Sequence, residues 1–270
     1  MKQYVICAEG GACGNFIATL IRTMWNPDHY KTYKSNITSN GSCDHMAFAA
    51  KLQYDYLIEH KKINLYPETE KGVQEVLTAL KDPHNTYDLL DSEEMKKFDR
   101  LHVIHYSFPD TIKRMLEIPN VYVIQVLIDE KDLNLATYNK IYKNFEVERN
   151  DKIKHILKDI KASLIRKRNI KYFSELEKVT NLAEIPKEII DIALEDMHKY
   201  LSNRIKIPIP AEHEKMLTLH LDEVYNSKDE LICKLSKFIG ASKNESTDEL
   251  FDTYMKAQQP ILNLLKNNHA

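Results

Sequence analysis

A cluster of glycines near the N-terminus is the feature that most constrains what this chain can fold into. Only six glycines occur in 270 residues, and three of them lie within five positions: Gly10, Gly11 and Gly14. An apolar run at residues 3–8 (QYVICA) precedes this glycine turn, and residues 15–24 after it carry apolar side chains at helical spacing. In a strand, turn and helix of this kind, backbone N–H groups converge on an anion and the helix N-terminus adds partial positive charge. The sequence therefore predicts a phosphate-binding loop over residues 10–16.

The glycine turn departs from the pattern of an ATP-hydrolysing P-loop. Against GxxxxGK[ST], Gly14 takes the last glycine, but Glu9 stands at the first glycine position. Asn15 and Phe16 stand where Lys and Ser or Thr are needed, so ATP hydrolysis is not expected. The alternative to an anion site is a tight turn in which a glycine adopts positive φ and no ligand binds. Because a turn alone rarely needs three glycines, the sequence favours the anion site.

Strand-like and helix-like segments alternate along much of the chain. Residues 101–105 (LHVIH), 121–128 (VYVIQVLI) and 216–221 (MLTLHL) predict strands, and helical periods lie between them. This alternation is typical of a parallel α/β sheet that is covered by helices. Residues 130–202 contain one helical pattern after another, with no repeat and no Gly/Ser linker. We therefore expect a single α/β domain over residues 1–270, with a mainly helical insertion at 130–202.

Two segments near the C-terminus carry the pattern of a capping box, in which Ser or Thr is followed three residues later by Glu. Ser227 pairs with Glu230 in this way, and Ser246 pairs with Glu249. Apolar residues at helical spacing follow each pair, so each pair predicts the start of a helix.

Three stretches, in the same order, resemble one family: the sulfotransferases of the P-loop fold, particularly the divergent members found in large DNA viruses and phages. Residues 5–21 (VICAEGGACGNFIATLI) look like their strand, 5′-phosphosulfate loop and helix. Residues 101–140 are similar to their strand ending in a catalytic His, Pro-containing turn, helix and strand leading into the 3′-phosphate segment. Residues 216–240 resemble their late strand, acidic turn and helix. The resemblance implies a three-layer fold, with a central, mostly parallel sheet between helices.

The resemblance also implies an activity, the transfer of a sulfonate group from 3′-phosphoadenosine 5′-phosphosulfate to a hydroxyl or amine of a small molecule or glycan. His105 corresponds to the family's general base, a role that suits histidine because its ordinary pKa of about 6.5 lets it accept a proton near neutral pH. The alternative is a strand-end histidine that bonds to the backbone. His102 points to the opposite face of the same strand, so it cannot share that site. The implied cofactor-binding residues are Gly10, Gly11, Ala12, Cys13, Gly14, Asn15, Phe16, Thr137 and Lys140.

Three positions depart from the family's pattern, and each lacks a polar or charged group. Ala12 stands where the loop commonly carries Lys or Arg, and Ile128 and Ala136 stand at the Arg and Ser that hold the 3′-phosphate. Each missing charge-assisted contact is worth roughly 1.5 to 3 kcal/mol. A second interpretation therefore stays open, in which a divergent protein of this fold binds a nucleotide or another phosphate ligand without sulfotransfer. Such a protein would be kinase-like, or a non-catalytic interaction module.

The cysteines and histidines do not have the spacing of a metal site. The four cysteines form no CxxC pair, and HxxH at His102 and His105, or CxH at Cys43 and His45, needs further ligands from elsewhere. We therefore expect no metal. Four cysteines are also too few to cross-link a chain of this length, so we expect reduced thiols and an intracellular location.

Charge and hydropathy restrict the partners. Lys and Arg number 38 against 40 Asp and Glu, a formal net charge of −2, so no overall positive field exists to hold nucleic acid. No apolar run reaches the 18 to 20 residues or so that span a bilayer, and the short N-terminal apolar stretch does not fit a signal peptide. We expect a soluble protein of the cytoplasm, and the resemblance to viral proteins implies the cytoplasm of an infected host. The expected partner is a nucleotide cofactor. The acceptor and the oligomeric state do not follow from the sequence.

Overall fold

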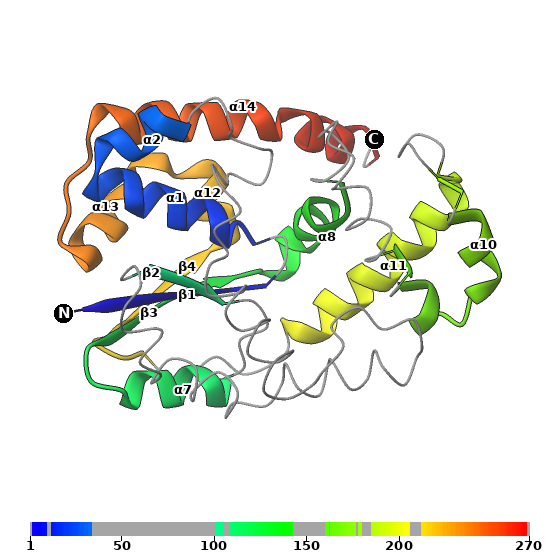
Figure 1. Ribbon diagram of the computed structural model, residues 1–270, viewed down its shortest axis with the longest axis horizontal. Helices are drawn as coiled ribbons and strands as arrows, with labels where there is room; N and C mark the ends of the chain where they lie inside the picture. The colour runs from blue at the N-terminus through cyan, green and yellow to red at the C-terminus, as the bar shows by residue number, and fades with distance from the viewer. Residues whose placement is uncertain are drawn as a thin grey trace.

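The centre of the molecule is a parallel β-sheet. The computed structural model describes residues 2–9, 12–33, 101–104, 109–142, 160–161, 163–176, 178–179, 185–205 and 212–268. Within these ranges four strands pair in parallel, in the order β2-β1-β3-β4 (Figure 1). The strands are β1 (Gln3–Ala8), β2 (Leu101–Ile104), β3 (Val121–Leu127) and β4 (Met216–His220). The predicted parallel α/β sheet is therefore confirmed.

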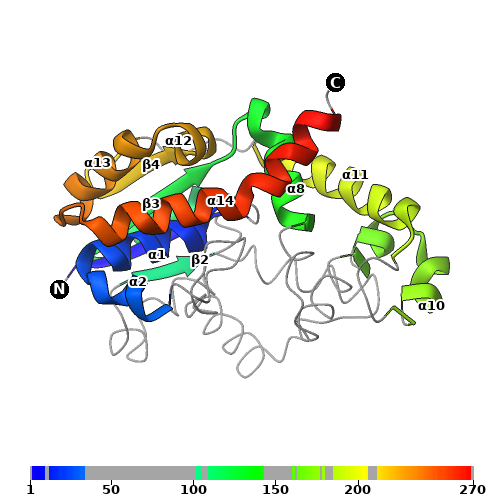
Figure 2. The same cartoon turned by 90° about the horizontal axis from the view of Figure 1, so that it is seen from above.

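Helices cover both faces of the sheet. On one face lie α1 (Gly14–Trp25), α13 (Lys228–Ile239) and α14 (Glu245–Asn268), and on the other lies α7 (Pro109–Glu117) (Figure 1). Figure 2 shows the molecule from the side that α1, α13 and α14 cover. Side chains of β1 alternate between the two faces: Ile6 packs into the larger core on the α1 face, and Val5 packs into the smaller core under α7. Burial on both faces explains why β1 and β3 are apolar at all positions except Gln3 and Gln125.

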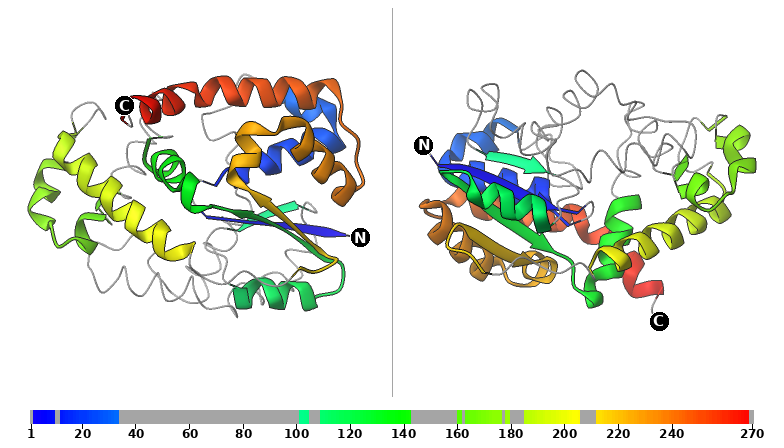
Figure 3. Two further views of the ribbon diagram at one scale, coloured as in Figure 1. Left: turned by 180° about the vertical axis from the view of Figure 1, so that it is seen from behind. Right: turned by 90° about the horizontal axis from the view of Figure 1, so that it is seen from below.

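The described elements between residues 130 and 202 are helical. Among them, α8 (Leu133–Tyr142) and α11 (Lys187–Arg204) pack against each other beyond the carboxyl ends of the strands (Figures 1 and 3). The remaining named elements are α2 (Pro27–Tyr33), η2 (Glu130–Asp132), η3 (Ile170–Tyr172), α10 (Phe173–Leu176) and α12 (Leu221–Asn226). In the described part of the chain, no helix is both long enough and apolar enough to cross a membrane.

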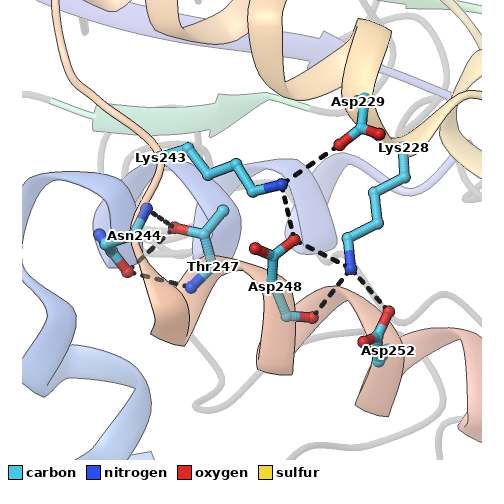
Figure 4. Close-up of polar contacts among 7 residues, drawn as sticks. All are labelled: Lys228, Asp229, Lys243, Asn244, Thr247, Asp248 and Asp252. Atoms are coloured by element: carbon cyan, nitrogen blue, oxygen red, sulfur yellow. Dashed lines mark hydrogen bonds and ion pairs between the residues drawn. The ribbon is translucent and has the colours of Figure 1, made fainter.

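The starts of the last two helices differ from the predicted capping boxes. Ser227 does precede α13, but its side chain makes no capping hydrogen bond. The cap of α14 is Asn244, whose Oδ1 accepts from the Thr247 backbone N–H at 3.0 Å, while the Asn244 N–H donates to Thr247 Oγ1 at 3.3 Å (Figure 4). The box predicted at Ser246 was therefore wrong by two residues, because Asn caps a helix as well as Ser does and a Thr hydroxyl replaces the Glu carboxylate.

Candidate functional site

The glycine turn lies at the carboxyl end of β1, a central strand of the described sheet. From β1 the chain continues into α1 on one face, whereas the helix that follows the neighbouring strand β2 is α7 on the opposite face (Figures 1 and 3). In open α/β sheets, ligands bind outside the carboxyl ends of the strands where neighbouring connections diverge in this way. The fold therefore puts the residues that follow β1 where a ligand is expected.

Helix α1 starts without a side-chain cap. The Ala12 N–H donates to the Glu9 carbonyl at 3.0 Å, which closes the turn, and Cys13 at the N-cap adopts the left-handed conformation with φ of 60°. Cys13 makes no side-chain capping bond, and the first turn of α1 contains no acidic residue. Because the first N–H groups of an α-helix have no acceptor within the helix, this end is suited to an anion.

Gly14 is required by close packing and not by its backbone conformation. A Cβ at Gly14 would lie 2.8 Å from Ala8 Cβ and 3.4 Å from Val103 Cγ1, so α1 starts almost in contact with the sheet. The left-handed residue in the described part of the turn is Cys13, which is not a glycine. Gly10 and Gly11 lie outside the described residues.

The start of α1 and the residues just before it direct most of their side chains into the protein interior. Ala12 and Phe16 are fully buried, and the Phe16 ring stacks on Tyr254 with 3.8 Å between ring centroids. Asn15 is half-buried, and its Oδ1 has no hydrogen-bond partner among the described residues. A ligand at this end of α1 would therefore meet backbone N–H groups and Asn15.

The Cys13 thiol belongs to a buried network of hydroxyl groups. Its Sγ lies 3.0 Å from Tyr254 Oη and 3.4 Å from Tyr225 Oη. Tyr225 Oη accepts from Asn139 Nδ2 at 2.8 Å and donates to Gln258 Oε1 at 3.3 Å. Burial, followed by the neighbouring Cys13, raises the pKa of both tyrosines well above the ordinary value. They therefore stay protonated, and they tie the start of α1 to α8, α12 and α14.

Glu9, the residue directly before the glycine turn, forms a buried ion pair with Arg204 at the end of α11. Arg204 Nε donates to Glu9 Oε1 at 2.7 Å, and Nη2 donates to the same oxygen. The side chains of Arg204 and Glu9 are only 10% and 15% exposed. Burial raises the pKa of Glu9, although the positive charges of Arg204 and Lys140 act to lower it. Glu9 Oε2 is buried and accepts no hydrogen bond within the described part of the chain.

The other residues that were expected to bind the cofactor differ in their exposure to solvent. Thr137 on α8 is 2% exposed, and its hydroxyl donates to the Leu133 carbonyl at 2.8 Å. Lys140 lies on the same helix, with its charge acting on Glu9. Ile128 and Ala136 are buried core residues, so neither position offers charge to a ligand. The expected base, His105, lies outside the described residues.

A second polar group, which the sequence analysis missed, lies at the carboxyl ends of β3 and β4. Asp129, Asp132 and Asp222 each offer a carboxylate oxygen, and these atoms lie within 4.8 Å of one another, as a divalent cation would need. Lys131 already pairs with Asp222, and His220 Nδ1 lies 2.8 Å from Asp129 Oδ2. Burial and the neighbouring carboxylates raise the pKa of Asp132. The signal in the sequence was the pair of Asp residues one or two positions after adjacent strands.

Comparisons with known proteins give this chain no relative. Neither a scan against protein-family models nor searches of curated proteins and of solved structures found a match. What the chain does must therefore be argued from its own residues and geometry.

Proposed function

We propose that this chain is a sulfotransferase-like transferase of the P-loop fold that binds 3′-phosphoadenosine 5′-phosphosulfate at the glycine turn. One observation carries the proposal: the N-terminus of α1 has no side-chain cap and directly follows the glycine turn, at the carboxyl end of β1. Backbone N–H groups of the turn and of the first turn of α1 would hold the phosphosulfate.

The proposed chemistry is a single displacement at sulfur. The acceptor oxygen bonds to sulfur while the bond from sulfur to the bridging phosphate oxygen breaks, and 3′-phosphoadenosine 5′-phosphate leaves with that electron pair. The positive end of α1 stabilises the charge that develops on the leaving phosphate. In the proposed reaction His105 accepts the proton of the acceptor. In the sequence it comes directly after β2, which pairs in parallel with β1, the strand before the glycine turn.

A specific observation favours a second candidate function, the binding of a phosphate ligand without sulfotransfer. The uncapped start of α1 would suit an anion on the 5′ side of the site, but the positions expected to hold the 3′-phosphate are the buried, uncharged Ile128 and Ala136. A ligand without a 3′-phosphate would lose no binding energy at these two positions. The two candidates therefore differ in the ligand that they select.

Ligand selection separates the two candidates. We expect 3′-phosphoadenosine 5′-phosphate to stabilise the protein against heat more than the same concentration of ADP or ATP does. At one hundred times its dissociation constant, it should add about 2.7 kcal/mol to the stability of the unliganded protein. Release of this product from 3′-phosphoadenosine 5′-phosphosulfate, in the presence of hydroxyl and amine acceptors, then measures turnover. Preference for ADP or ATP, or binding without turnover, would favour the second candidate. A chain that binds none of these nucleotides and no inorganic phosphate would contradict both.

His105→Ala tests the base. Since proton abstraction matters only in the transition state, this variant should lower the rate of sulfotransfer by roughly 10² to 10⁴ and leave the affinity for the nucleotide nearly unchanged. His102→Ala is the matched control, because the two-residue period of a strand predicts that His102 and His105 point to opposite faces. Equal losses of rate in the two variants, or loss of nucleotide binding in His105→Ala, would remove His105 from this role.

A further inference from the structure

An anion at the glycine turn needs positive charge that the turn does not contain. Residues 9–16 (EGGACGNF) include one charged side chain, the carboxylate of Glu9. A multiply charged phosphate beside this carboxylate would be repelled unless a cation lay between or beside them. The cation must therefore come from another part of the chain.

Arg204 is the residue that meets this need. It lies 195 positions after Glu9, at the end of α11, and this end of the helix lies beside the carboxyl end of β1 (Figures 1 and 3). Nε and Nη2 of Arg204 both donate to Oε1 of Glu9, while Oε2 accepts no hydrogen bond in the described part of the chain. Buried ion pairs of this kind are often no better for stability than apolar residues of similar volume, so stability alone is a weak reason for this one.

Lys140 adds a second positive charge to the same place. It lies on α8, which packs against α11, and its charge acts on the Glu9 carboxylate together with that of Arg204. Positive charges from two helices therefore act on one carboxylate, and both lower its pKa. Tyr200, one helical turn before Arg204 on α11, also acts to lower the pKa of Glu9.

We propose that Arg204 is the cation of the glycine-turn site, held in place by Glu9, and that its guanidinium binds the phosphate or phosphosulfate group of the ligand. This inference rests on the anion-binding function proposed above. Arginine suits the task because its planar guanidinium offers five N–H donors in a fixed fork, so it can bond a carboxylate and a phosphate at once. Glu9 then acts as a positioning residue that also weakens binding through its own negative charge. Arg204 replaces the basic residue that is missing at Ala12.

The test compares two variants that differ only at Arg204. Arg204→Gln alone would leave the Glu9 carboxylate buried without its partner, so the comparison is Glu9→Gln against Glu9→Gln/Arg204→Gln, in the full chain. The measurement is the calorimetric affinity for 3′-phosphoadenosine 5′-phosphate and, separately, for inorganic sulfate. Glu9→Gln keeps a side-chain oxygen that can accept from Arg204 and removes the negative charge, so we expect it to bind both anions severalfold more tightly than the unmodified chain. Addition of Arg204→Gln should then weaken binding by about ten- to a hundredfold.

Arg166→Gln is the matched control. Arg166, which precedes α11 in the chain, makes a comparable ion pair with Asp196 on α11, and its Nε lies 2.8 Å from Asp196 Oδ2. This variant should lower the thermal stability and leave the affinity for both anions unchanged. Equal affinities of Glu9→Gln and Glu9→Gln/Arg204→Gln would overturn the role of Arg204 and leave the proposed anion site standing. If the unmodified chain binds neither anion, the proposed function fails, and this inference fails with it.

Discussion

At the scale of single residues, the start of α1 combines three constraints in consecutive positions. Cys13 takes the left-handed conformation although it is not a glycine, which costs an ordinary residue roughly 1 to 2 kcal/mol. Its thiol is in turn held by the hydroxyl groups of Tyr225 and Tyr254. Gly14 lets the helix approach the sheet, and Asn15 is the one polar side chain in the first turn. The backbone N–H groups are thereby kept in one orientation before any ligand arrives.

Asn15→Asp tests whether an anion binds at this end of the helix. A carboxylate in the first turn is favoured by the helix dipole, so we expect the variant to fold. The same carboxylate repels an anionic ligand, and the affinity for 3′-phosphoadenosine 5′-phosphate should fall at least about fivefold in a calorimetric titration. Asn120→Asp introduces the same charge directly before β3, at the opposite edge of the sheet, and should leave the affinity unchanged. Equal affinities of the two variants would argue against a ligand at α1.

At the scale of elements, the contact between α1 and the sheet depends on two small residues. Gly14 and Ala8 approach so closely that a Cβ on Gly14 would come within 2.8 Å of the Ala8 Cβ. Because this contact sets how near the first turn of α1 lies to the end of β1, it also sets the shape of the candidate site.

Gly14→Ala should therefore destabilise the fold by roughly 1 to 3 kcal/mol, the usual cost of overpacking. Urea denaturation followed by circular dichroism measures the change. The double variant Ala8→Gly/Gly14→Ala moves the methyl group to the other side of the contact and should recover part of the loss. A Gly14→Ala variant as stable as the unmodified chain would show that α1 can move away from the sheet without cost.

Ion pairs connect the start of α13 and the segment after it to the start of α14. Lys228 and Lys243 both pair with Asp248, in the first turn of α14, at 3.0 Å each, and Lys228 also pairs with Asp252 (Figure 4). Burial raises the pKa of Asp248, but the two lysines outweigh it, and the pKa lies below its ordinary value in the folded protein. Its contribution to stability is therefore present above the unfolded-state pKa of about 3.9 and is lost as the pH falls through the lower, folded-state pKa.

Asp248→Asn should lower the free energy of unfolding at pH 7 by up to about 1 kcal/mol, the range of partly exposed ion pairs. The difference from the unmodified chain should shrink as the pH falls below 4, because Asp248 then becomes protonated, first in the unfolded chain and then, through its lowered pKa, in the folded protein. Chemical denaturation at pH 7 and at pH 3 measures both values. Asp252→Asn, at a carboxylate that is 71% exposed, should have a smaller effect. A loss that is the same at both pH values would contradict the electrostatic explanation.

At the scale of the whole molecule, the buried hydroxyl network connects segments far apart in sequence. It joins Cys13 to Tyr225 and Tyr254, and through Tyr225 it reaches Asn139 and Gln258. The start of α1 is thus fastened to helices before and after β4, on the side of the sheet away from α7. A ligand at the glycine turn would bind to a segment that the rest of the fold already holds.

Tyr254→Phe removes one hydroxyl from this network and keeps the ring that stacks on Phe16. We expect a loss of about 1 kcal/mol in the free energy of unfolding, the usual contribution of a buried hydrogen bond. Tyr4→Phe is the control: Tyr4 is equally buried, but its hydroxyl bonds to the Ile239 carbonyl at a long 3.5 Å, so the loss should be smaller. Thermal or urea denaturation compares the two, and an equal loss would mean that the network adds nothing beyond one ordinary contact.

The sequence by itself determined the local elements and their parallel arrangement. Residues 3–8, 101–104 and 121–127 are short and apolar because both faces of the sheet are covered, and helical spacing after the glycine turn predicted α1. Each of these patterns is local, because it lies within a few consecutive residues. The residue types and the spacing of apolar side chains are therefore enough to detect it. The loop expected over residues 10–16 is shorter, because α1 begins at Gly14, where the close contact with the sheet lets the helix start.

The tertiary structure alone decided which side chains meet. Nothing in the spacing of the sequence links Glu9 to Arg204, Cys13 to Tyr254, or Asp129 to His220, because each pair is separated by 91 residues or more. The sequence also does not show why position 14 needs a glycine. The cause is the close contact between the start of α1 and Ala8 on the sheet, and not the backbone conformation. The spacing of apolar residues indicates which face of a helix or strand is buried. Which side chains pack against that face depends on how the whole chain folds.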